Sequence, residues 1–244
     1  MNGRPWETEL EQFLQSKLDA LSVTPNQGIG RRTVRIFPPP AEDEAKYFML
    51  GMEAGLFEVG QDGRIQSRLL ALPAEHSETG EIFGLFTSEP GTPRLVRERV
   101  VQLAAAAALI FDRGWLERQV QLLPSGAGDP VDILLRSLTG KLLTAVAIKR
   151  TAPELTKLDL DLSQCCRRGE HPIDNCGFPQ NHRYFEYCVS HRPPYFWAVA
   201  PGADVCFQLA YPLDGIIQIQ TLSTLPRRSR IELEHESYWR ETES

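Results

Sequence analysis

The chain lacks any apolar run long enough to cross a bilayer, and its first residues, MNGRPWETELEQF, are charged from the start. We therefore expect neither a transmembrane helix nor a signal peptide. Cysteine is scarce: the 244 residues hold five, an odd number, and no Cys-x2-Cys pair occurs among them. An odd set of cysteines in a chain without an export signal predicts reduced thiols and a cytoplasmic protein.

The chain also lacks the overall positive charge of many nucleic-acid enzymes, since its formal net charge is −6. The charge is unevenly spread, however. Residues 1–93 hold 8 basic and 14 acidic side chains, residues 94–230 hold 17 and 13, and residues 231–244 hold 1 and 5. The central part is therefore the basic part, which suits a phosphate-bearing partner, although a solvated face explains a bias of this size equally well.

With 42% hydrophobic residues, the chain can form one large domain, or one domain with an appended module. Its first part is predicted to hold four elements, namely helices at 6–21 and 41–54, a strand at 33–37 and a hairpin within 56–70. Residues 74–92 are polar and punctuated by glycine and proline, which indicates a linker. We therefore expect an N-terminal α+β module over residues 1–92 and a core over residues 93–230.

The core is predicted to begin with a long helix and to continue with three strands, a second helix and a further strand. These elements are expected at residues 93–112, 115–123, 131–137, 142–149, 152–165 and 195–200. The turn pair Thr139-Gly140 favours a hairpin between the second and third strands, and Thr151 is placed to cap the second helix. Nearly continuous apolar residues in these strands indicate burial on both faces. We therefore predict an α/β fold with a central mixed sheet flanked by helices.

Two polar residues frame the predicted hairpin. Asp132 lies at the start of one strand and Lys149 at the end of its antiparallel neighbour, so both side chains come out at the same edge of the sheet. We expect the chemistry of the protein at that edge, although an acid and a lysine at strand ends are also common as solvated residues.

Pro130-x-Asp132 is followed by a hairpin, a strand ending in Ala-Ile-Lys and then a helix. In the order of its parts, this stretch resembles the core of the PD-(D/E)xK nuclease superfamily, which has the restriction-endonuclease-like fold. In that family an Asp and a second acid hold one or two divalent cations, Mg2+ or Mn2+, and the Lys two residues further on orients or activates the attacking water. The resemblance implies that Asp132 is a metal ligand, that Lys149 is the lysine, and that Glu98 on the first core helix is an auxiliary acid. An exposed helical glutamate without a catalytic role explains Glu98 equally well.

The chain departs from the family pattern at one position, where Ala147 stands in place of the second acid. Loss of one of two carboxylates should remove most of the activity, because Mg2+ depends on oxygen ligands. Three explanations compete. The protein is a degenerate binder, or its second acid lies elsewhere in the chain, or an acid was changed to alanine to stop cleavage, as in an engineered knockout.

Residues 165–192 form an insertion that contains several cysteines and histidines. Cys166-x4-His171-x4-Cys176 has the spacing of half a zinc knuckle, and His182 completes a Cys2His2 set for a structural Zn2+. Buried thiols and hydrogen-bonded histidines explain the same residues without a metal. Cations also alternate with aromatic residues here, which suits phosphate contact and base stacking. The candidate nucleic-acid-binding residues are Arg150, Lys157, Arg167, Arg168, His182 and Arg183.

These expectations lead to one function and two alternatives. The first is a metal-dependent DNA phosphodiesterase of the PD-(D/E)xK type, inactive in this form because of Ala147. The second is a non-catalytic nucleic-acid-binding or scaffold subunit that kept the nuclease fold, and the third is a protein-interaction module that recruits a partner through its acidic N-terminal part. The lack of a recognisable specificity domain fits a multi-protein system such as bacterial defence. The acidic tail at residues 231–244 is expected to be mobile or a partner-binding strand.

Overall fold

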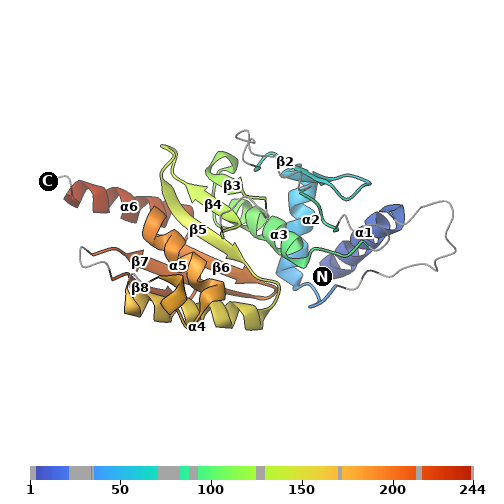
Figure 1. Ribbon diagram of the computed structural model, residues 1–244. Coiled ribbons are helices and arrows are strands. Elements are labelled where there is room, and N and C mark those ends of the chain that lie inside the picture. Colours follow the sequence, from blue (N-terminus) through green and yellow to red (C-terminus); the bar gives the residue numbers. More distant parts are fainter. Residues whose placement is uncertain are drawn as a thin grey trace.

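The computed structural model describes residues 4–21, 34, 36–70, 83–87, 93–124, 130–169, 172–212 and 216–242, with the backbone alone over residues 236–242. Its centre is a six-stranded mixed sheet flanked by helices, which confirms the α/β class (Figure 1). In the order of the sheet, the strands are β3 (Val120–Leu122), β4 (Ile133–Arg136), β5 (Leu142–Ile148), β6 (Tyr195–Ala200), β7 (Ala203–Ala210) and β8 (Gln218–Leu222). Neighbouring strands pair antiparallel except β5 and β6, which run parallel.

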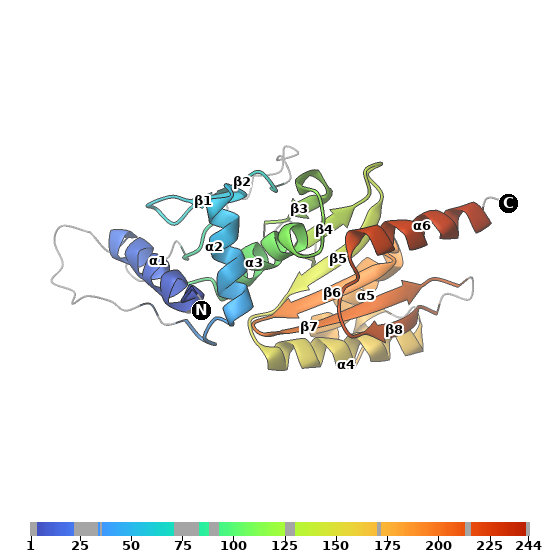
Figure 2. The same cartoon turned by 180° about the vertical axis from the view of Figure 1, so that it is seen from behind.

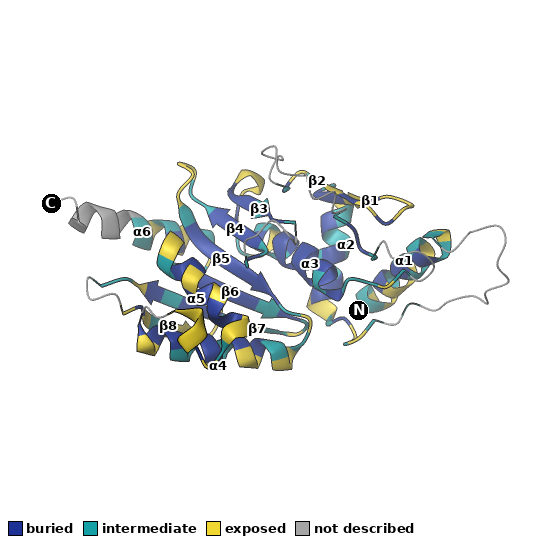
Figure 3. Cartoon of the chain, viewed as in Figure 1, coloured by how far each residue is buried: buried dark blue, intermediate teal, exposed yellow. Residues whose placement is uncertain are grey.

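Helices cover both faces of this sheet (Figures 1 and 2), and the three that cover its central strands are α3 (Arg97–Phe111), α4 (Ala152–Arg168) and α5 (Pro179–His191). Leu143 and Val146 of β5 belong to the apolar cluster on the α3 side. Ala145 and Ala147 of the same strand belong to the cluster under α4 and α5. Strands β5 and β6 are therefore buried almost throughout (Figure 3), as their nearly continuous apolar sequences predict.

Helix α4 begins directly after the edge of the sheet that carries Lys149, and local sequence explains why. The side chain of Thr151 accepts a hydrogen bond from the Glu154 N–H at 3.3 Å, which caps the first turn as predicted. Helical spacing then places a row of apolar residues against the sheet, namely Leu155, Leu158 and Leu162. The start of α4 is thus fixed by its own residues, and with it the position of the segment that follows Lys149.

The N-terminal segment comprises α1 (Trp6–Leu21), α2 (Glu42–Glu53), β1 (Phe57–Val59) and β2 (Ile65–Ser67). Its buried apolar residues join the same cluster as α3 and one face of the sheet. The buried carboxylate of Glu44 on α2 accepts a hydrogen bond from Arg97 Nη2 of α3 at 2.7 Å. The segment expected as a separate module therefore shares a core with the sheet. Of the expected linker, residues 83–87 are described, and there Gly84 pairs with Arg64 beside β2.

Two predicted strands differ from the structure. Residues 117–119 form a turn of 3-10 helix, so that only Val120–Leu122 of the expected strand 115–123 pairs with β4. Opposite the end of β4, the Gln119 side chain donates from Nε2 to the Arg136 carbonyl at 3.0 Å, so a side chain makes the contact there in place of a strand pair. In the expected strand 33–37, the described residues 34, 36 and 37 are not extended against a neighbour, and residues 33 and 35 lie outside the described part.

The prediction for the C-terminal tail was wrong, because α6 (Arg228–Thr242) is a helix. Ile231 of this helix is completely buried in the apolar cluster on the α3 side. Arg230 and Glu234, one turn apart, pair at 2.7 Å on its surface. None of the helices in the described part of the chain combines the length and the apolar character needed to cross a bilayer.

Candidate functional site

Asp132 and Lys149 come out at one edge of the sheet, as their places in the sequence predict. Asp132 lies just before β4 and Lys149 just after β5. The backbone N–H of Asp132 donates to the Val146 carbonyl at 2.8 Å, and the Asp132 Oδ2 accepts from the Ile148 N–H at 2.7 Å. The Asp132 carboxylate is therefore held against the end of β5 that carries Lys149.

Burial and charge act on the Asp132 carboxyl in opposite directions. Burial raises its pKa from 3.8 to about 6, while the Ile148 N–H and the cations of Arg99, Lys149 and Arg183 favour the charged form. The three cations therefore partly offset the effect of burial on the Asp132 carboxyl.

Helix α3 supports Asp132 through residues that the sequence analysis did not single out. The buried Gln102 donates from Nε2 to the carbonyls of Leu123, at 3.0 Å, and of Asp132, at 2.7 Å. Arg99, one turn earlier, donates to Gln102 Oε1, and its guanidinium lies over the Phe83 ring, 3.9 Å from the ring centroid. The available signal was that Gln102 is the one polar residue after Arg99 in a helix that is otherwise apolar from Val100 to Phe111. Gln102 fixes the backbone at Asp132, and its hydrogen bond with Arg99 holds the Arg99 guanidinium in place.

Helix α5 holds the ammonium group of Lys149. Lys149 Nζ donates to the Tyr184 hydroxyl at 3.0 Å and to Asn181 Oδ1 at 3.5 Å, and it lies 4.4 Å from the centroid of the Tyr184 ring. The amide of Asn181 in turn donates to the buried Asp161 Oδ2 at 2.7 Å. Arg183 also donates to the Tyr184 hydroxyl, at 3.3 Å. Lys149 is therefore positioned by an amide and a phenol, and a carboxylate on α4 orients that amide.

Glu98, the expected auxiliary acid, lies in the first turn of α3 and faces the segment after Lys149. Its Oε1 is 3.1 Å from Arg150 Nε, and Arg150 Nη2 is 3.1 Å from Glu154 Oε1. These three side chains are partly exposed. The structure thus brings Glu98 to the same edge as Asp132 and Lys149, with its carboxylate engaged by an arginine.

The Mg2+ ion that the family resemblance implies does not fit the residues at this edge. Ala147 is completely buried beneath α4 and α5 and offers no oxygen, and its neighbour on β6 is Ala198. Asp132 supplies one carboxylate, which is protonated below about pH 6 and shares an oxygen with the Ile148 N–H. Mg2+ requires an octahedral set of oxygen ligands, and nearby cations oppose its binding. We therefore derive no reaction step through a metal ion at Asp132.

The predicted nucleic-acid-binding residues divide into separate groups. Arg150, Lys157 and Arg183 are exposed near the starts of α4 and α5, where Lys157 Nζ donates to Gln180 Oε1 at 3.2 Å. The adjacent residues 167 and 168 are exposed on the last turn of α4, about 24 Å along the helix axis from its first residue. The ring of His182 is completely buried and unable to touch DNA. The structure thus brings three of the six predicted contacts close to Lys149.

The predicted zinc ligands are also rearranged. The structure brings together Cys165, Cys176 and His182, whose ligand atoms lie within 4.8 Å of one another. Cys165 therefore takes the place that the sequence predicted for Cys166, which is completely buried and lies outside this group of ligand atoms. His171, the remaining predicted ligand, lies outside the described residues.

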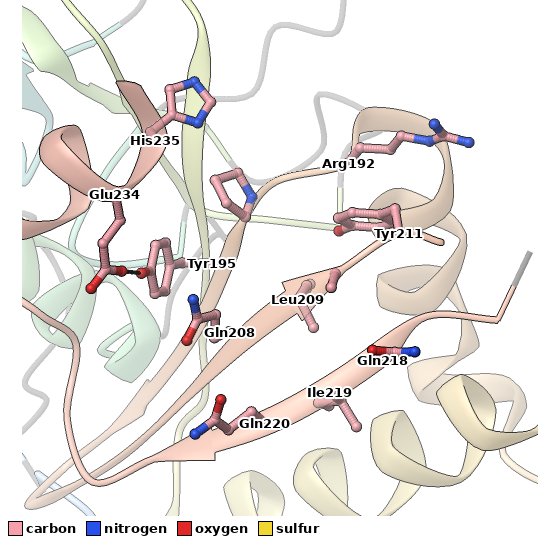
Figure 4. A pocket seen from close by; sticks show the side chains of 12 residues that line it. Arg192, Tyr195, Gln208, Leu209, Tyr211, Gln218, Ile219, Gln220, Glu234 and His235 are labelled. Carbon is pink, nitrogen blue, oxygen red and sulfur yellow. Dashed lines mark hydrogen bonds between the residues drawn. The ribbon is translucent and has the colours of Figure 1, made fainter. Parts of the chain in front are cut away.

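A hollow that no sequence pattern indicated lies between β6, β7, β8 and α6 (Figure 4). Its volume is about 400 Å3, and its lining includes Gln208, Gln218 and Gln220 from the two outer strands. The hydroxyl of Tyr195 donates to the carboxylate of Glu234 across it, and burial raises the pKa of that tyrosine. Tyr195 begins β6, whereas the Lys149 N–H pairs with the Val199 carbonyl about 13 Å further along that strand. The hollow therefore lies at the opposite end of the sheet from Asp132.

The edge around Asp132 accordingly combines one carboxyl that titrates near pH 6, three cations, an amide and a phenol. Such a set offers positive charge and hydrogen-bond donors, but it lacks the paired carboxylates that hold catalytic divalent cations. No family model, no curated protein and no solved structure matches this chain.

Proposed function

We propose that this chain is a DNA-binding protein built on a PD-(D/E)xK-type, restriction-endonuclease-like core, and that it does not cleave DNA by itself. The order of its elements supports the fold: α3, the antiparallel strands β3, β4 and β5, then α4, and finally β6 parallel to β5. That order is the one that the resemblance implies, with α5 added before β6. Asp132 and Lys149 occupy the edge at which the family carries its site.

One observation carries the functional part of the proposal, namely that Lys149 and the exposed Arg183 both donate to the Tyr184 hydroxyl beside the edge of the sheet that carries Asp132. Lysine and arginine are the residues that contact phosphate oxygens, and phosphate contacts supply most of the affinity of non-specific DNA binding. The first turn of α5, which holds Asn181, adds the positive end of a helix dipole close to Lys149. A phosphate of the DNA backbone fits this set better than a metal ion does.

Binding of a fluorescently labelled duplex, measured by anisotropy at several salt concentrations, tests the proposal. The variants are Lys149→Gln and Arg183→Gln, and the matched control is Arg118→Gln, an exposed arginine beside the other end of β3. A plot of the logarithm of the association constant against the logarithm of the salt concentration should become less steep by about 0.9 for each lost phosphate contact. Over the roughly tenfold range between about 1 M and about 0.1 M salt, this change corresponds to about eightfold weaker binding at 0.1 M. The control should bind like the parent protein.

Equal binding by all three variants, or no salt-dependent binding of the parent protein, would overturn the proposal. Competition with unlabelled single-stranded DNA and RNA serves as a further arm. If either competitor displaces the duplex much more effectively than duplex DNA itself, the assignment to duplex DNA is wrong, since A-form and single-stranded ligands are bound by different surfaces.

A second function, a nuclease with an acid at position 147, is favoured by one observation. Ala147 lies two residues before Lys149 on the strand that ends at this edge, and the family's second acid occupies that position. The variant that separates a nuclease from a non-cleaving binder is Ala147→Glu.

A further inference from the structure

Three buried residues converge between α4 and α5. Cys165 lies on α4, Cys176 follows the short 3-10 helix at Ile173–Asn175, and His182 lies in the first half of α5. The two sulfur atoms are 3.6 Å apart, and the Cys165 Sγ is 3.9 Å from His182 Nδ1. At most 9% of any of these residues is exposed.

The distance between the two sulfur atoms matches the edge of a zinc tetrahedron, and the distance from sulfur to nitrogen is slightly longer than such an edge. With Zn–S bonds of about 2.3 Å and Zn–N bonds of about 2.0 Å, tetrahedral angles place two sulfurs about 3.8 Å apart and a sulfur and a nitrogen about 3.5 Å apart. A disulfide would require the sulfurs to lie about 2.05 Å apart. The observed distance between the sulfurs is therefore close to that of two ligands on one ion.

We propose that Cys165, Cys176 and His182 bind a zinc ion that ties α4, the segment before α5 and α5 itself together. Zinc suits the donor set, because two sulfurs and an imidazole are the ligands that structural zinc sites use. The three donors occupy three corners of the tetrahedron. The inference does not rest on DNA binding, since all three residues are buried and cannot touch DNA.

Contacts around the donors favour their metal-binding forms. The Phe178 N–H donates to the Cys176 sulfur at 3.4 Å, and a backbone donor of this kind stabilises a thiolate. His182 Nε2 lies 3.3 Å from Glu186 Oε1, one turn further along α5. Histidines that bind metals usually present their second nitrogen to a carboxylate, which leaves the first nitrogen free of a proton. Here that first nitrogen is Nδ1, the atom directed at Cys165.

Charge also favours a cation at this place. Asp161, one turn before Cys165 on α4, is 3% exposed and accepts a hydrogen bond from the neutral amide of Asn181. Two thiolates beside a buried carboxylate would repel one another in an apolar surrounding, and a divalent cation offsets that repulsion.

Metal analysis of the protein purified under reducing conditions tests the inference. We expect one zinc ion per chain, and we expect Co2+ that replaces it to show the charge-transfer absorption of thiolate ligands. The variants Cys165→Ser and Cys176→Ser should lose the metal, whereas Cys206→Ser, which changes a buried cysteine on β7 outside the cluster, should retain it.

The cobalt spectrum is recorded on the parent protein, so the test holds even if a serine variant fails to fold. A reduced protein that takes up neither Zn2+ nor Co2+ would overturn the inference. So would retention of the metal by a folded Cys165→Ser variant, or a spectrum without thiolate bands. Detection of a Cys165–Cys176 disulfide in a protein that binds no metal when reduced would assign these cysteines to redox chemistry instead.

Discussion

Replacement of Asp132 by asparagine should make the protein more stable at neutral and alkaline pH. Asparagine has nearly the shape of aspartate, and its Oδ1 can accept the hydrogen bond that Ile148 N–H donates to Asp132 at 2.7 Å. The substitution therefore removes the titrating charge and keeps the contact that orients the side chain. The effect on stability then reports the electrostatic penalty of a buried carboxylate.

The pKa of Asp132 gives both the sign and the size of this effect. The carboxyl has its ordinary pKa of 3.8 in the unfolded chain and a pKa of about 6 in the folded protein, because burial disfavours its charged form. Between these two values the folded protein binds more protons than the unfolded chain, so the free energy of unfolding falls as the pH rises through this window. The difference between the two pKa values corresponds to a loss of at most about 3 kcal/mol in the free energy of unfolding, and this loss is complete above about pH 6. Asp132→Asn should therefore gain about 2 kcal/mol at pH 8 and almost nothing at pH 4.

Urea unfolding followed by tryptophan fluorescence at a series of pH values measures the difference. Asp174→Asn, which changes an exposed aspartate of the 3-10 helix before α5, is the control and should show no pH-dependent gain. An Asp132→Asn protein that is less stable than the parent at pH 8, or a difference that does not change between pH 4 and pH 8, would refute the reasoning. The first result would mean that the cations outweigh the effect of burial on the Asp132 pKa, and the second that they balance it.

Two further substitutions test the site and the core. Ala147→Glu places a carboxylate at a fully buried position, so we expect loss of about 2 kcal/mol of stability and no cleavage of plasmid or single-stranded DNA with Mg2+ or Mn2+. Ala145→Glu, buried under the same helices, is the control for stability, and cleavage by the Ala147 variant alone would show that the protein is a nuclease lacking its acid. Glu44→Gln leaves the buried Arg97 without its counter-charge and should lower the free energy of unfolding by about 3 kcal/mol, measured by urea unfolding at pH 7. Glu42→Gln, on the exposed side of the same helix, should have little effect, and equal stability of both glutamine variants would contradict the importance of the pair.

Local patterns predicted much of the fold. The helix at residues 6–21 and the strand at residues 195–200 have the expected bounds, because helical spacing in one and a continuous apolar run in the other depend on neighbouring residues alone. The common edge of Asp132 and Lys149 was predictable for a different reason. Antiparallel pairing fixes which strand ends meet, whatever packs against the sheet.

Helix α5 was not predictable in the same way. Its buried side chains include Asn181, His182 and Tyr184, so polar residues occupy positions that an apolar stripe would normally mark. The sequence was equally unable to show whether Cys165 or Cys166 joins the candidate metal ligands. Neighbouring residues on a helix point about 100° apart, and only the rotation of α4 about its axis decides which thiol meets Cys176.

The polar residues that concealed α5 also explain how it is held in place. Asn181 and Tyr184, three residues apart, lie on one side of the helix and contact Lys149, while His182, about 100° around the axis, points to Cys165. A movement that takes the His182 ring away from the sulfurs must therefore also move the amide and the phenol that position the lysine ammonium. The residues of the proposed zinc site and of the proposed phosphate site thus lie on different sides of one helix, whose amide and phenol hold the lysine ammonium.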